Sequence, residues 1–312
     1  MHKVSGRWQL GFALALATSI VWSTLPIGLE IALKQVDPET VTWLRFLVSA
    51  LILGTWLALR GQLPGPSSLT PRGWLIVAIS LAGLIGNYLT YAHALKYVSP
   101  TVNQTVIQLA PMFLLLGGVV FLREQFGAGQ RVGFVVLAIG LVLFSNQRLG
   151  ELRAMGGNYF IGVALLVFAS VIWSFYGIGQ KLLLRSLGAQ QLLWILYAGS
   201  VLALSPIANP SVIVHVSLPQ AVAIAYCCFN TLAGYGAFAA AMEHWEVSRV
   251  SAVLATSPIF TLASMWLAER MWPGLLRPEH LNGLAFVGAL AVVAGSIVSA
   301  LGGRIRTAPS GA

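Results

Sequence analysis

The segment SIVWSTLPIGLEIALK, residues 19–34, decides the fold, because a second segment, SVIWSFYGIGQKLLLR, repeats its pattern at residues 170–185. Identical residues occupy several positions of the two segments at a constant separation of 151 residues: Ser19 and Ser170, Trp22 and Trp173, Ser23 and Ser174, Ile27 and Ile178, Gly28 and Gly179. Weak internal similarity of this kind indicates a structural repeat. The sequence therefore predicts two related halves, each of which begins with the same apolar helix.

Composition places both halves in a membrane. Of the 312 residues, 57% are hydrophobic and 9% are charged, whereas a soluble globular domain has about 25% charged residues. Long apolar runs recur along the chain, and a helix of about 20 apolar residues crosses the hydrocarbon core of a bilayer. The net charge of +9 comes from scattered Lys and Arg residues, not from the basic stripe typical of nucleic-acid binding. We predict an all-α integral membrane protein with no nucleic-acid partner.

Glycines, prolines and charged residues interrupt the apolar sequence and delimit its spans. They predict ten transmembrane helices, at residues 10–34, 40–59, 73–96, 100–122, 131–147, 158–184, 190–206, 218–242, 248–268 and 281–301. The first apolar run continues to Leu33, so we interpret it as a membrane span rather than a cleaved signal peptide. Residues 10–147 are expected to form the first half and 158–301 the second, each with five spans, while 302–312 form a cytoplasmic tail.

The orientation of the spans follows from the basic residues in the short loops. With the amino terminus in the cytoplasm, the inside segments hold 11 Lys and Arg residues and the outside segments hold 7, which favours both termini inside. Because each half has an odd number of spans, the second half enters the membrane from the opposite side. Such a 5+5 inverted-topology repeat is typical of transporters with a site between the repeats. The alternative interpretation is that the duplication only builds a larger helical bundle and has no connection with transport.

Polar residues form matching faces on the two repeated helices. At positions i, i+4, i+7 and i+11 the first helix carries Ser19, Ser23, Pro26 and Glu30, and the second carries Ser170, Ser174, Gly177 and Lys181. Polar groups inside a membrane are costly and usually face protein or a water-filled cavity. Glu30 lies roughly 12 Å from the middle of its span. We therefore interpret Glu30 and Lys181 as gate or ion-pair residues, with proton coupling through Glu30 as the alternative.

Two tryptophans and one arginine lie well inside their spans. Most other tryptophans lie near span ends, where an aromatic belt accounts for them. For Trp22 and Trp173 two interpretations stay open: packing between helices, or a wall that offers aromatic faces to a substrate. Arg45 either holds a carboxylate or bonds carbonyl groups at a helix end, and at this point we favour the second interpretation.

A further set of residues aligns at a separation of 147 residues: Tyr88 with Tyr235, Ala94 with Ala241, and Pro111 with Pro258. The two prolines lie deep in the fourth and ninth spans. Proline removes a hydrogen bond from the helix and frees a backbone carbonyl, which permits bending. We predict that Pro111 and Pro258 act as hinges.

These features together resemble the drug/metabolite transporter superfamily. They comprise ten spans in a 5+5 repeat, the Trp-Ser pairs beginning at Trp22 and Trp173, a glycine-rich last span, and a proline followed by a span-end glutamate in each half: Pro111 with Glu124, Pro258 with Glu269. Within the superfamily the chain is similar to the EamA-type exporters. Among these it looks most like the bacterial branch that exports aromatic amino acids.

The resemblance implies a multi-pass secondary carrier of the bacterial inner membrane. Such a carrier exports aromatic or other hydrophobic amino acids and related metabolites by alternating access through a central cavity. The resemblance implies that eight residues form the wall of this cavity: Trp22, Asn87, Tyr91, Asn103, Gln108, Trp173, Tyr176 and Asn230. The expected partners are a small-molecule substrate and the lipid bilayer, with the chain as a monomer or a homodimer. No cofactor and no metal is expected.

Two other functions stay open at this point. A proton-coupled exporter of cationic drugs would use Glu30 as its proton carrier. An integral-membrane enzyme, such as a lipid transferase, is disfavoured because the sequence has no H-E-x-x-H motif, no paired acidic motif and no recognisable nucleophile and base. We therefore expect a transporter and no enzymatic activity.

Overall fold

The computed structural model describes residues 7–98, 103, 106–144, 146, 157–271 and 282–301, and none of these residues lies in a β-strand. Six segments are long and apolar enough to cross a bilayer: Trp8–Ala32, Pro38–Leu59, Pro71–Ala94, Tyr159–Leu183, Leu218–His244 and Val247–Ala268. Four shorter apolar helices accompany them: Leu109–Leu122, Ala128–Phe144, Ala189–Leu204 and Gly283–Ser299. The predicted all-α membrane fold is confirmed over the described residues. The count of ten spans and the position of the termini stay predictions.

In chain order the α-helices are α1 (Trp8–Ser23), α2 (Leu25–Ala32), α3 (Pro38–Leu59), α4 (Pro71–Ala94), α6 (Leu109–Leu122), α7 (Ala128–Phe144), α9 (Gly157–Leu183), α10 (Ala189–Leu204), α11 (Leu218–His244), α12 (Val247–Leu254), α13 (Ser257–Met271) and α14 (Gly283–Leu301). Local sequence explains two of the starts. Asp37 accepts a hydrogen bond from the Thr40 amide (2.8 Å) at the start of α3, and the Thr70 hydroxyl accepts one from the Gly73 amide (3.2 Å) at the start of α4. Both caps precede a proline, the arrangement that favours a helix start.

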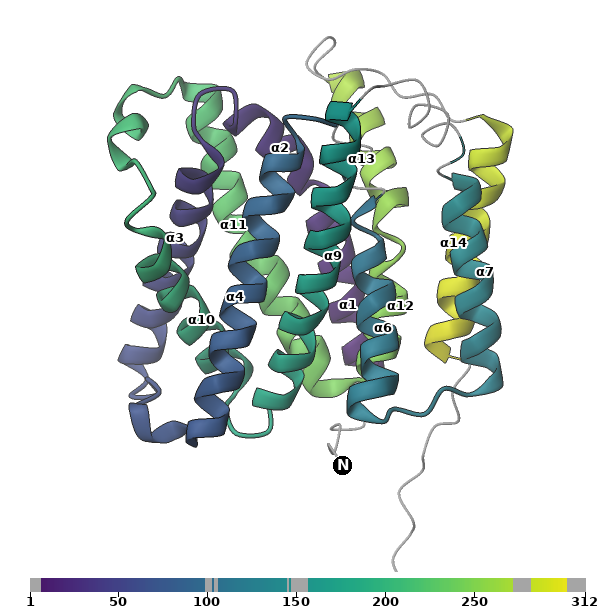
Figure 1. Cartoon of the computed structure of the whole chain (residues 1–312), viewed down its shortest axis with the longest axis horizontal. Coiled ribbons are helices and arrows are strands. Elements are labelled where there is room, and N and C mark those ends of the chain that lie inside the picture. The colour runs from purple at the N-terminus through teal and green to yellow at the C-terminus, as the bar shows by residue number, and fades with distance from the viewer. Residues whose placement is uncertain are drawn as a thin grey trace, which may run out of the picture.

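The helices stand side by side in one bundle (Figure 1). Neighbours far apart in the sequence pack along each other: α1 with α11, α4 with α9, α3 with α10, and α7 with α14. In the view of Figure 1, α7 and α14 form one edge of the bundle and α3 forms the opposite edge. The largest buried cluster lies between these edges and contains much of α9, α10, α11 and α12.

Glycines bring α7 and α14 into backbone contact. A Cβ atom on Gly140 would lie 2.6 Å from the backbone nitrogen of Val292, and one on Gly133 would lie 2.7 Å from the carbonyl oxygen of Gly295. Real Cβ atoms do not approach backbone so closely. In a membrane, where lipid removes the hydrophobic drive between helices, such close approach supplies the packing. The two helices therefore depend on glycine at these positions.

Three spans are interrupted before a proline. The breaks lie at Thr24 before Pro26, at residues 107–108 before Pro111, and at residues 255–256 before Pro258. A proline cannot donate to the carbonyl four residues earlier and its ring clashes with that carbonyl. By contrast α9, which has Gly177 where the first repeat has Pro26, continues without a break over Gly157–Leu183. The predicted hinge prolines thus follow helix breaks directly.

Candidate substrate cavity

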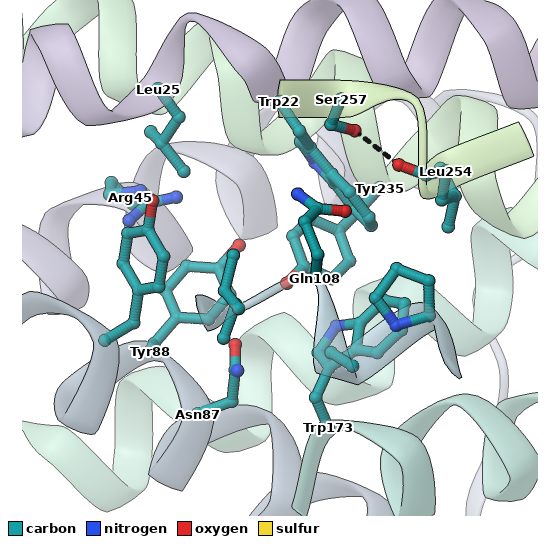
Figure 2. A pocket seen from close by; sticks show the side chains of 14 residues that line it. Trp22, Leu25, Arg45, Asn87, Tyr88, Gln108, Trp173, Tyr235, Leu254 and Ser257 are labelled. Atoms are coloured by element: carbon teal, nitrogen blue, oxygen red, sulfur yellow. Dashed lines mark hydrogen bonds between the residues drawn. The ribbon is translucent and has the colours of Figure 1, made fainter. Parts of the chain in front are cut away.

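A cavity of about 90 Å³ lies in the core beside the three interruptions (Figure 2). Its wall is mostly aromatic, aliphatic and uncharged polar: Trp22, Leu25, Arg45, Asn87, Tyr88, Tyr91, Ile107, Gln108, Ala110, Pro111, Trp173, Tyr235, Leu254 and Ser257. Five residues of the predicted wall lie in it, namely Trp22, Asn87, Tyr91, Gln108 and Trp173. Interruptions far apart in the sequence thus contribute to one cavity.

Each interruption supplies a wall residue. Three of the lining residues lie four positions before a proline: Trp22 before Pro26, Ile107 before Pro111, and Leu254 before Pro258. Their carbonyls are the ones that the prolines cannot bond. Other groups take over this role, because the Ser257 hydroxyl donates to the Leu254 carbonyl (2.7 Å) and the Ala110 amide donates to the Ile107 carbonyl (2.8 Å). At these two breaks the carbonyl is thus hydrogen-bonded without a continuous helix.

Two of the broken spans are linked through hydroxyl groups. The Ser19 hydroxyl in α1 lies 2.9 Å from the Ser257 hydroxyl and 3.2 Å from the Thr256 hydroxyl, at the break between α12 and α13. The Thr261 hydroxyl donates to the Ser23 carbonyl (3.0 Å). The predicted serine face of the first repeat therefore binds helix to helix, next to the cavity.

Replacing Ser19 with alanine is expected to lower the free energy of unfolding by about 1–2 kcal/mol, because the buried Ser257 hydroxyl and the partly buried Thr256 hydroxyl lose a hydrogen-bond partner. Ser200→Ala is the matched control, since Ser200 is equally buried but bonds only the Leu196 carbonyl of its own helix (2.8 Å). Unfolding in mixed detergent micelles measures both. Equal losses in the two variants would contradict a specific role for the Ser19 link.

Aromatic rings form one continuous side of the cavity. Trp22 lies edge-on to Trp173, with 5.8 Å between ring centroids, and packs against Tyr235 at 4.7 Å. Trp173 packs in turn against Phe238 at 5.3 Å. Pairs in this range of distances stabilise each other beyond their buried area. The two tryptophan rings therefore pack together and also line the cavity, while their contact with a substrate stays a prediction.

Arg45 is the charged member of the wall. Its side chain is only 2% exposed, its Nε donates to the Thr231 hydroxyl (2.8 Å), and its guanidinium lies 4.3 Å from the centroid of the Tyr88 ring. The expectation that Arg45 bonds helix-end carbonyls is wrong. The partners that the structure gives it are a hydroxyl and an aromatic ring on other helices, which no local sequence pattern reveals.

Three residues of the predicted wall lie behind the lining. The Asn103 side chain donates to the Tyr91 carbonyl (3.0 Å). The Asn230 side chain donates to the Val21 carbonyl (2.6 Å), at the break between α1 and α2. Tyr176 is fully buried and packs against Trp173 at 6.3 Å. These side chains hold the wall residues in place.

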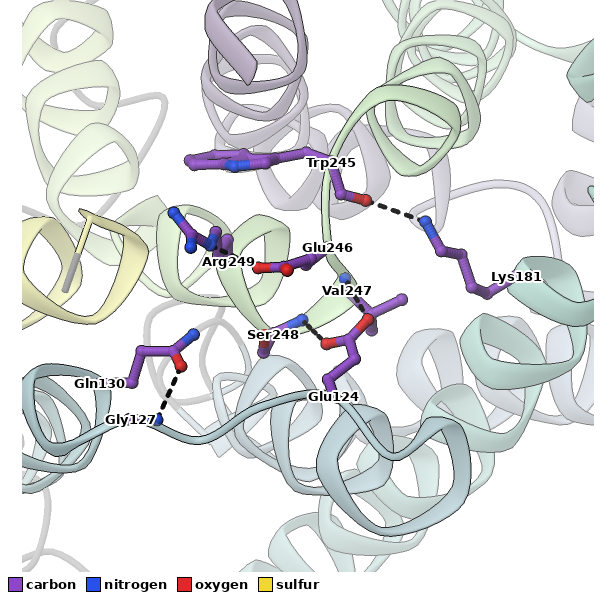
Figure 3. A network of polar contacts seen from close by, with 9 residues as sticks. All are labelled: Glu124, Gly127, Gln130, Lys181, Trp245, Glu246, Val247, Ser248 and Arg249. Carbon is purple, nitrogen blue, oxygen red and sulfur yellow. Dashed lines mark hydrogen bonds and ion pairs between the residues drawn. The ribbon is translucent and has the colours of Figure 1, made fainter. Parts of the chain in front are cut away.

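A polar network lies at the end of the bundle at which α11 turns into α12 (Figure 3). The Glu124 carboxylate, just after α6, accepts hydrogen bonds from the Val247 and Ser248 amides (2.9 Å each). Lys181 of α9 donates to the Trp245 carbonyl (2.9 Å) and to the Met242 carbonyl. One charged group thus stabilises the start of α12 and the other the end of α11, as helix dipoles favour. The network thus joins the segment after α6 to α12, and α9 to the end of α11.

The two predicted gate residues lie at opposite ends of the bundle. Trp245, which Lys181 contacts, packs against Phe12 near the start of α1, with 6.0 Å between ring centroids. Glu30 follows Phe12 by 18 residues, which is roughly 27 Å of helix. Glu30 is half-buried in α2, outside the cavity wall. The two residues therefore cannot pair with each other.

The sequence reasoning missed several wall residues, of which Tyr88 and Tyr235 are the most informative. Their rings lie 5.5 Å apart in the structure. Their alignment across the halves was a usable signal, because a residue kept at the same place in both repeats faces the same internal axis. Three other wall residues are ordinary apolar residues: Leu25, Ile107 and Leu254. The only sequence signal for their place in the wall is the proline close to each of them.

The wall offers groups that bind rather than react. It holds aromatic rings, the amides of Asn87 and Gln108, the hydroxyl groups of Ser257 and of three tyrosines, and one cation at Arg45. Within the described part of the chain, no group of three or more His, Cys, Asp or Glu side chains could hold a metal ion. At about 90 Å³, the cavity is smaller than the roughly 300–1,000 Å³ of common ligand sites. An amino-acid-sized molecule therefore requires the walls to move apart.

Comparison with known proteins agrees with this picture. The sequence profile of the EamA-like transporter family matches residues 9–146 and again residues 160–301. The chain is 39% identical over 297 residues to the inner membrane transporter YhbE of Escherichia coli strain K12, covering 95% of this chain and 92% of YhbE. It is 23% identical over 307 residues to a probable amino-acid metabolite efflux pump of Salmonella typhimurium strain LT2, covering 94% and 95%.

The fold is also known from experiment. A solved crystal structure has a TM-score of 0.72 to this chain at 18% identity, covering 94% of this chain and 98% of the other. The EamA-type resemblance is confirmed, whereas the branch exporting aromatic amino acids stays a prediction. The protein is a multi-pass inner-membrane protein, and its relatives are named as transporters. The chain belongs to the EamA-like transporter family, in the drug/metabolite transporter superfamily.

Proposed function

We propose that this protein is a secondary carrier that exports aromatic or other hydrophobic amino acids and related metabolites by alternating access. The observation that carries the proposal is the cavity wall, in which aromatic rings meet amide and hydroxyl groups at three interrupted helices. Interrupted helices beside a central cavity are the usual form of a transporter's substrate site. The amino-acid metabolite efflux pump named among the relatives supports the substrate class.

The proposed architecture is a 5+5 inverted repeat of ten spans, with halves at 10–147 and 158–301 and both termini in the cytoplasm. Helix packing supports it. Exchange of the halves would convert the pairing of α1 with α11 into that of α4 with α9, and both pairings are present. The same exchange would return the pairs α3 with α10 and α7 with α14 to themselves, and both of these occur as well. The cavity then lies at the interface of the repeats.

In the proposed cycle the ends of the bundle open in turn. Pro111 and Pro258 allow the interrupted spans to bend, and the network around Glu124 and Lys181 acts as the gate at the end where α1 begins. Glu30 lies near the other end. We assign the substrate contacts to Trp22, Asn87, Tyr91, Gln108 and Trp173, with Asn103, Tyr176 and Asn230 supporting them from behind.

Transport of labelled L-phenylalanine into proteoliposomes tests the proposal. We expect saturable flux, and a loss of about 10-fold or more in Trp173→Leu, because the substitution removes an aromatic face from the wall. Trp266→Leu is the matched control, since Trp266 of α13 is 60% exposed and lies outside the wall. Absence of saturable flux for every aromatic and aliphatic amino acid tested would overturn the proposal.

The alternative of a proton-coupled cationic drug exporter receives less support from the cavity. Its wall holds the cation Arg45 and no Asp or Glu side chain. A cationic drug in this cavity would meet a like charge at low dielectric, which is unfavourable. Glu30, the proton carrier in that alternative, lies outside the wall.

A further inference from the structure

Arg45 presents an energetic problem that the wall alone does not solve. Its side chain is 2% exposed and lies within the apolar span Pro38–Leu59. A charged side chain inside a membrane is costly unless a counter-charge or strong hydrogen bonds compensate it. Tyr88 compensates part of this cost, because its ring lies 4.3 Å from the guanidinium and a cation–π contact is favourable when it is shielded from water.

No carboxylate of the described residues completes the compensation. The ion pairs found among them join His93 to Glu39 and Arg249 to Glu246, and neither includes Arg45. Within the described part of the chain, the Arg45 side chain makes one hydrogen bond, which uses Nε and goes to Thr231. The two terminal nitrogens, which form the fork that grips a carboxylate, are therefore left for another partner. Figure 2 shows the guanidinium at the cavity, between Leu25 and Tyr88.

We infer that Arg45 is the specificity residue that binds the carboxylate of the transported molecule. The inference rests on the proposed function and narrows its substrate class to molecules that join a carboxylate to an aromatic or apolar group. Tyr88, beside Arg45, continues the aromatic side of the cavity through Tyr235, 5.5 Å away, to Trp22, 4.7 Å further. A carboxylate at Arg45 thus places the rest of the molecule against these rings.

The charge balance of the wall sets an order among ligands. Arg45 is positive and none of the described lining side chains is acidic, so the wall offers a counter-charge to a carboxylate and none to an ammonium group. A monocarboxylate without an amino group is therefore accepted at least as well as a zwitterionic amino acid. An amine that lacks the carboxylate is rejected, because it would leave Arg45 unpaired and add a second buried cation.

Three molecules with the same ring test this order: L-phenylalanine, 3-phenylpropanoate and 2-phenylethylamine. In proteoliposomes with the wild-type protein, phenylpropanoate is expected to inhibit labelled phenylalanine flux and phenylethylamine is not. Arg45→Gln is expected to lose about 10-fold or more in phenylalanine flux at low substrate concentration, and to lose the preference for phenylpropanoate over phenylethylamine. Arg45→Lys keeps the charge but not the fork, so it retains the preference with weaker half-saturation.

Arg60→Gln is the matched control. Arg60 lies at the end of the same helix and stacks on Trp56 at 4.3 Å, but it is exposed and outside the wall. This variant should behave like the wild type. If Arg45→Gln fails to fold, Arg45→Lys and a binding measurement decide, because phenylpropanoate should raise the melting temperature of the purified wild type more than that of Arg45→Lys.

The outcomes separate the two proposals. Wild-type flux of phenylalanine that phenylethylamine inhibits as strongly as phenylpropanoate would overturn the role of Arg45 and leave the carrier function standing. Unchanged preference in both Arg45 variants would do the same. Absence of flux for all amino acids would overturn the proposed function, whereas phenylpropanoate stabilisation that depends on Arg45 would still identify a carboxylate site.

Discussion

Gly140→Ala is expected to lower the free energy of unfolding by about 2–3 kcal/mol, near the upper end for an overpacked core. The added methyl group would lie 2.6 Å from the backbone nitrogen of Val292 and 2.9 Å from the carbonyl carbon of Ala291. Both contacts are backbone atoms of α14, which cannot rotate away as a side chain can. The two helices must therefore separate along their length, and the close packing that holds them in the membrane is lost.

The matched control for this prediction is Gly236→Ala, another glycine inside a helix. A Cβ atom at Gly236 would meet nothing within 4 Å, so alanine there is expected to be neutral or to stabilise α11 by up to about 1 kcal/mol. Unfolding in mixed micelles, followed by helical circular dichroism, measures both variants. Effects of the same sign and size would show that glycine packing does not explain the α7–α14 contact.

Lys181→Met is expected to have the largest effect on the closed end of the bundle, of about 3 kcal/mol. The ammonium group donates to the carbonyls of Met242 and Trp245, and hydrogen bonds to charged groups contribute about 1.5–3 kcal/mol each. Without them the end of α11 and the turn into α12 lose their anchor on α9. In the proposed cycle, about 3 kcal/mol shifts the balance between closed and open ends by roughly 100-fold.

Amide hydrogen exchange detects this change. Peptides that cover Trp245 to Arg249 are expected to exchange roughly 100-fold faster in Lys181→Met, because opening of this end exposes their amides. Peptides from α7, which lies at the edge of the bundle, should exchange as in the wild type. Lys34→Met serves as the control for loss of a charge, since Lys34 is exposed. Unchanged exchange around Trp245 in Lys181→Met would rule out its role as a gate.

Much of the fold could be predicted because membrane spans depend on local properties. The length and apolar composition of the segments predicted the helices. The prolines indicated the breaks, because a proline lacks the backbone N–H and so removes a hydrogen bond from its own helix. The wall was harder. Trp22 and Trp173 were identified by repetition and by their depth in the span, but Asn103, Tyr176 and Asn230 turned out to support the lining instead of forming it. The rotation of a helix about its own axis decides whether a side chain faces the cavity or lies behind the wall. A polar stripe in the sequence does not define this rotation precisely enough to separate neighbouring positions.

Arg45 illustrates the part that sequence could not provide. Its hydrogen-bond partner Thr231 lies 186 residues away in the chain, and its aromatic partner Tyr88 lies on a third helix. A lone arginine in an apolar run has two common roles, and the helix-end role is the more frequent one. Only the arrangement of α3, α4 and α11 around it distinguishes an arginine in a cavity wall from one at a helix end.

Helix α9 passes unbroken through the core, whereas the corresponding span of the first half is divided at Thr24. In the proposed cycle we therefore expect the two sides of the cavity to bend unequally, so that no symmetry makes the two open forms equal in free energy. A carrier that rests mainly in one form reaches half-saturation at a lower concentration on the face where that form opens. Net flux must vanish when the substrate concentrations on the two sides are equal, so the ratio of maximal rate to half-saturation concentration is the same in both directions. The maximal rate from that face is therefore lower in the same proportion as the half-saturation concentration. In the proposed cycle, the broken and unbroken helices would thus give the carrier two kinetically different faces without any source of energy.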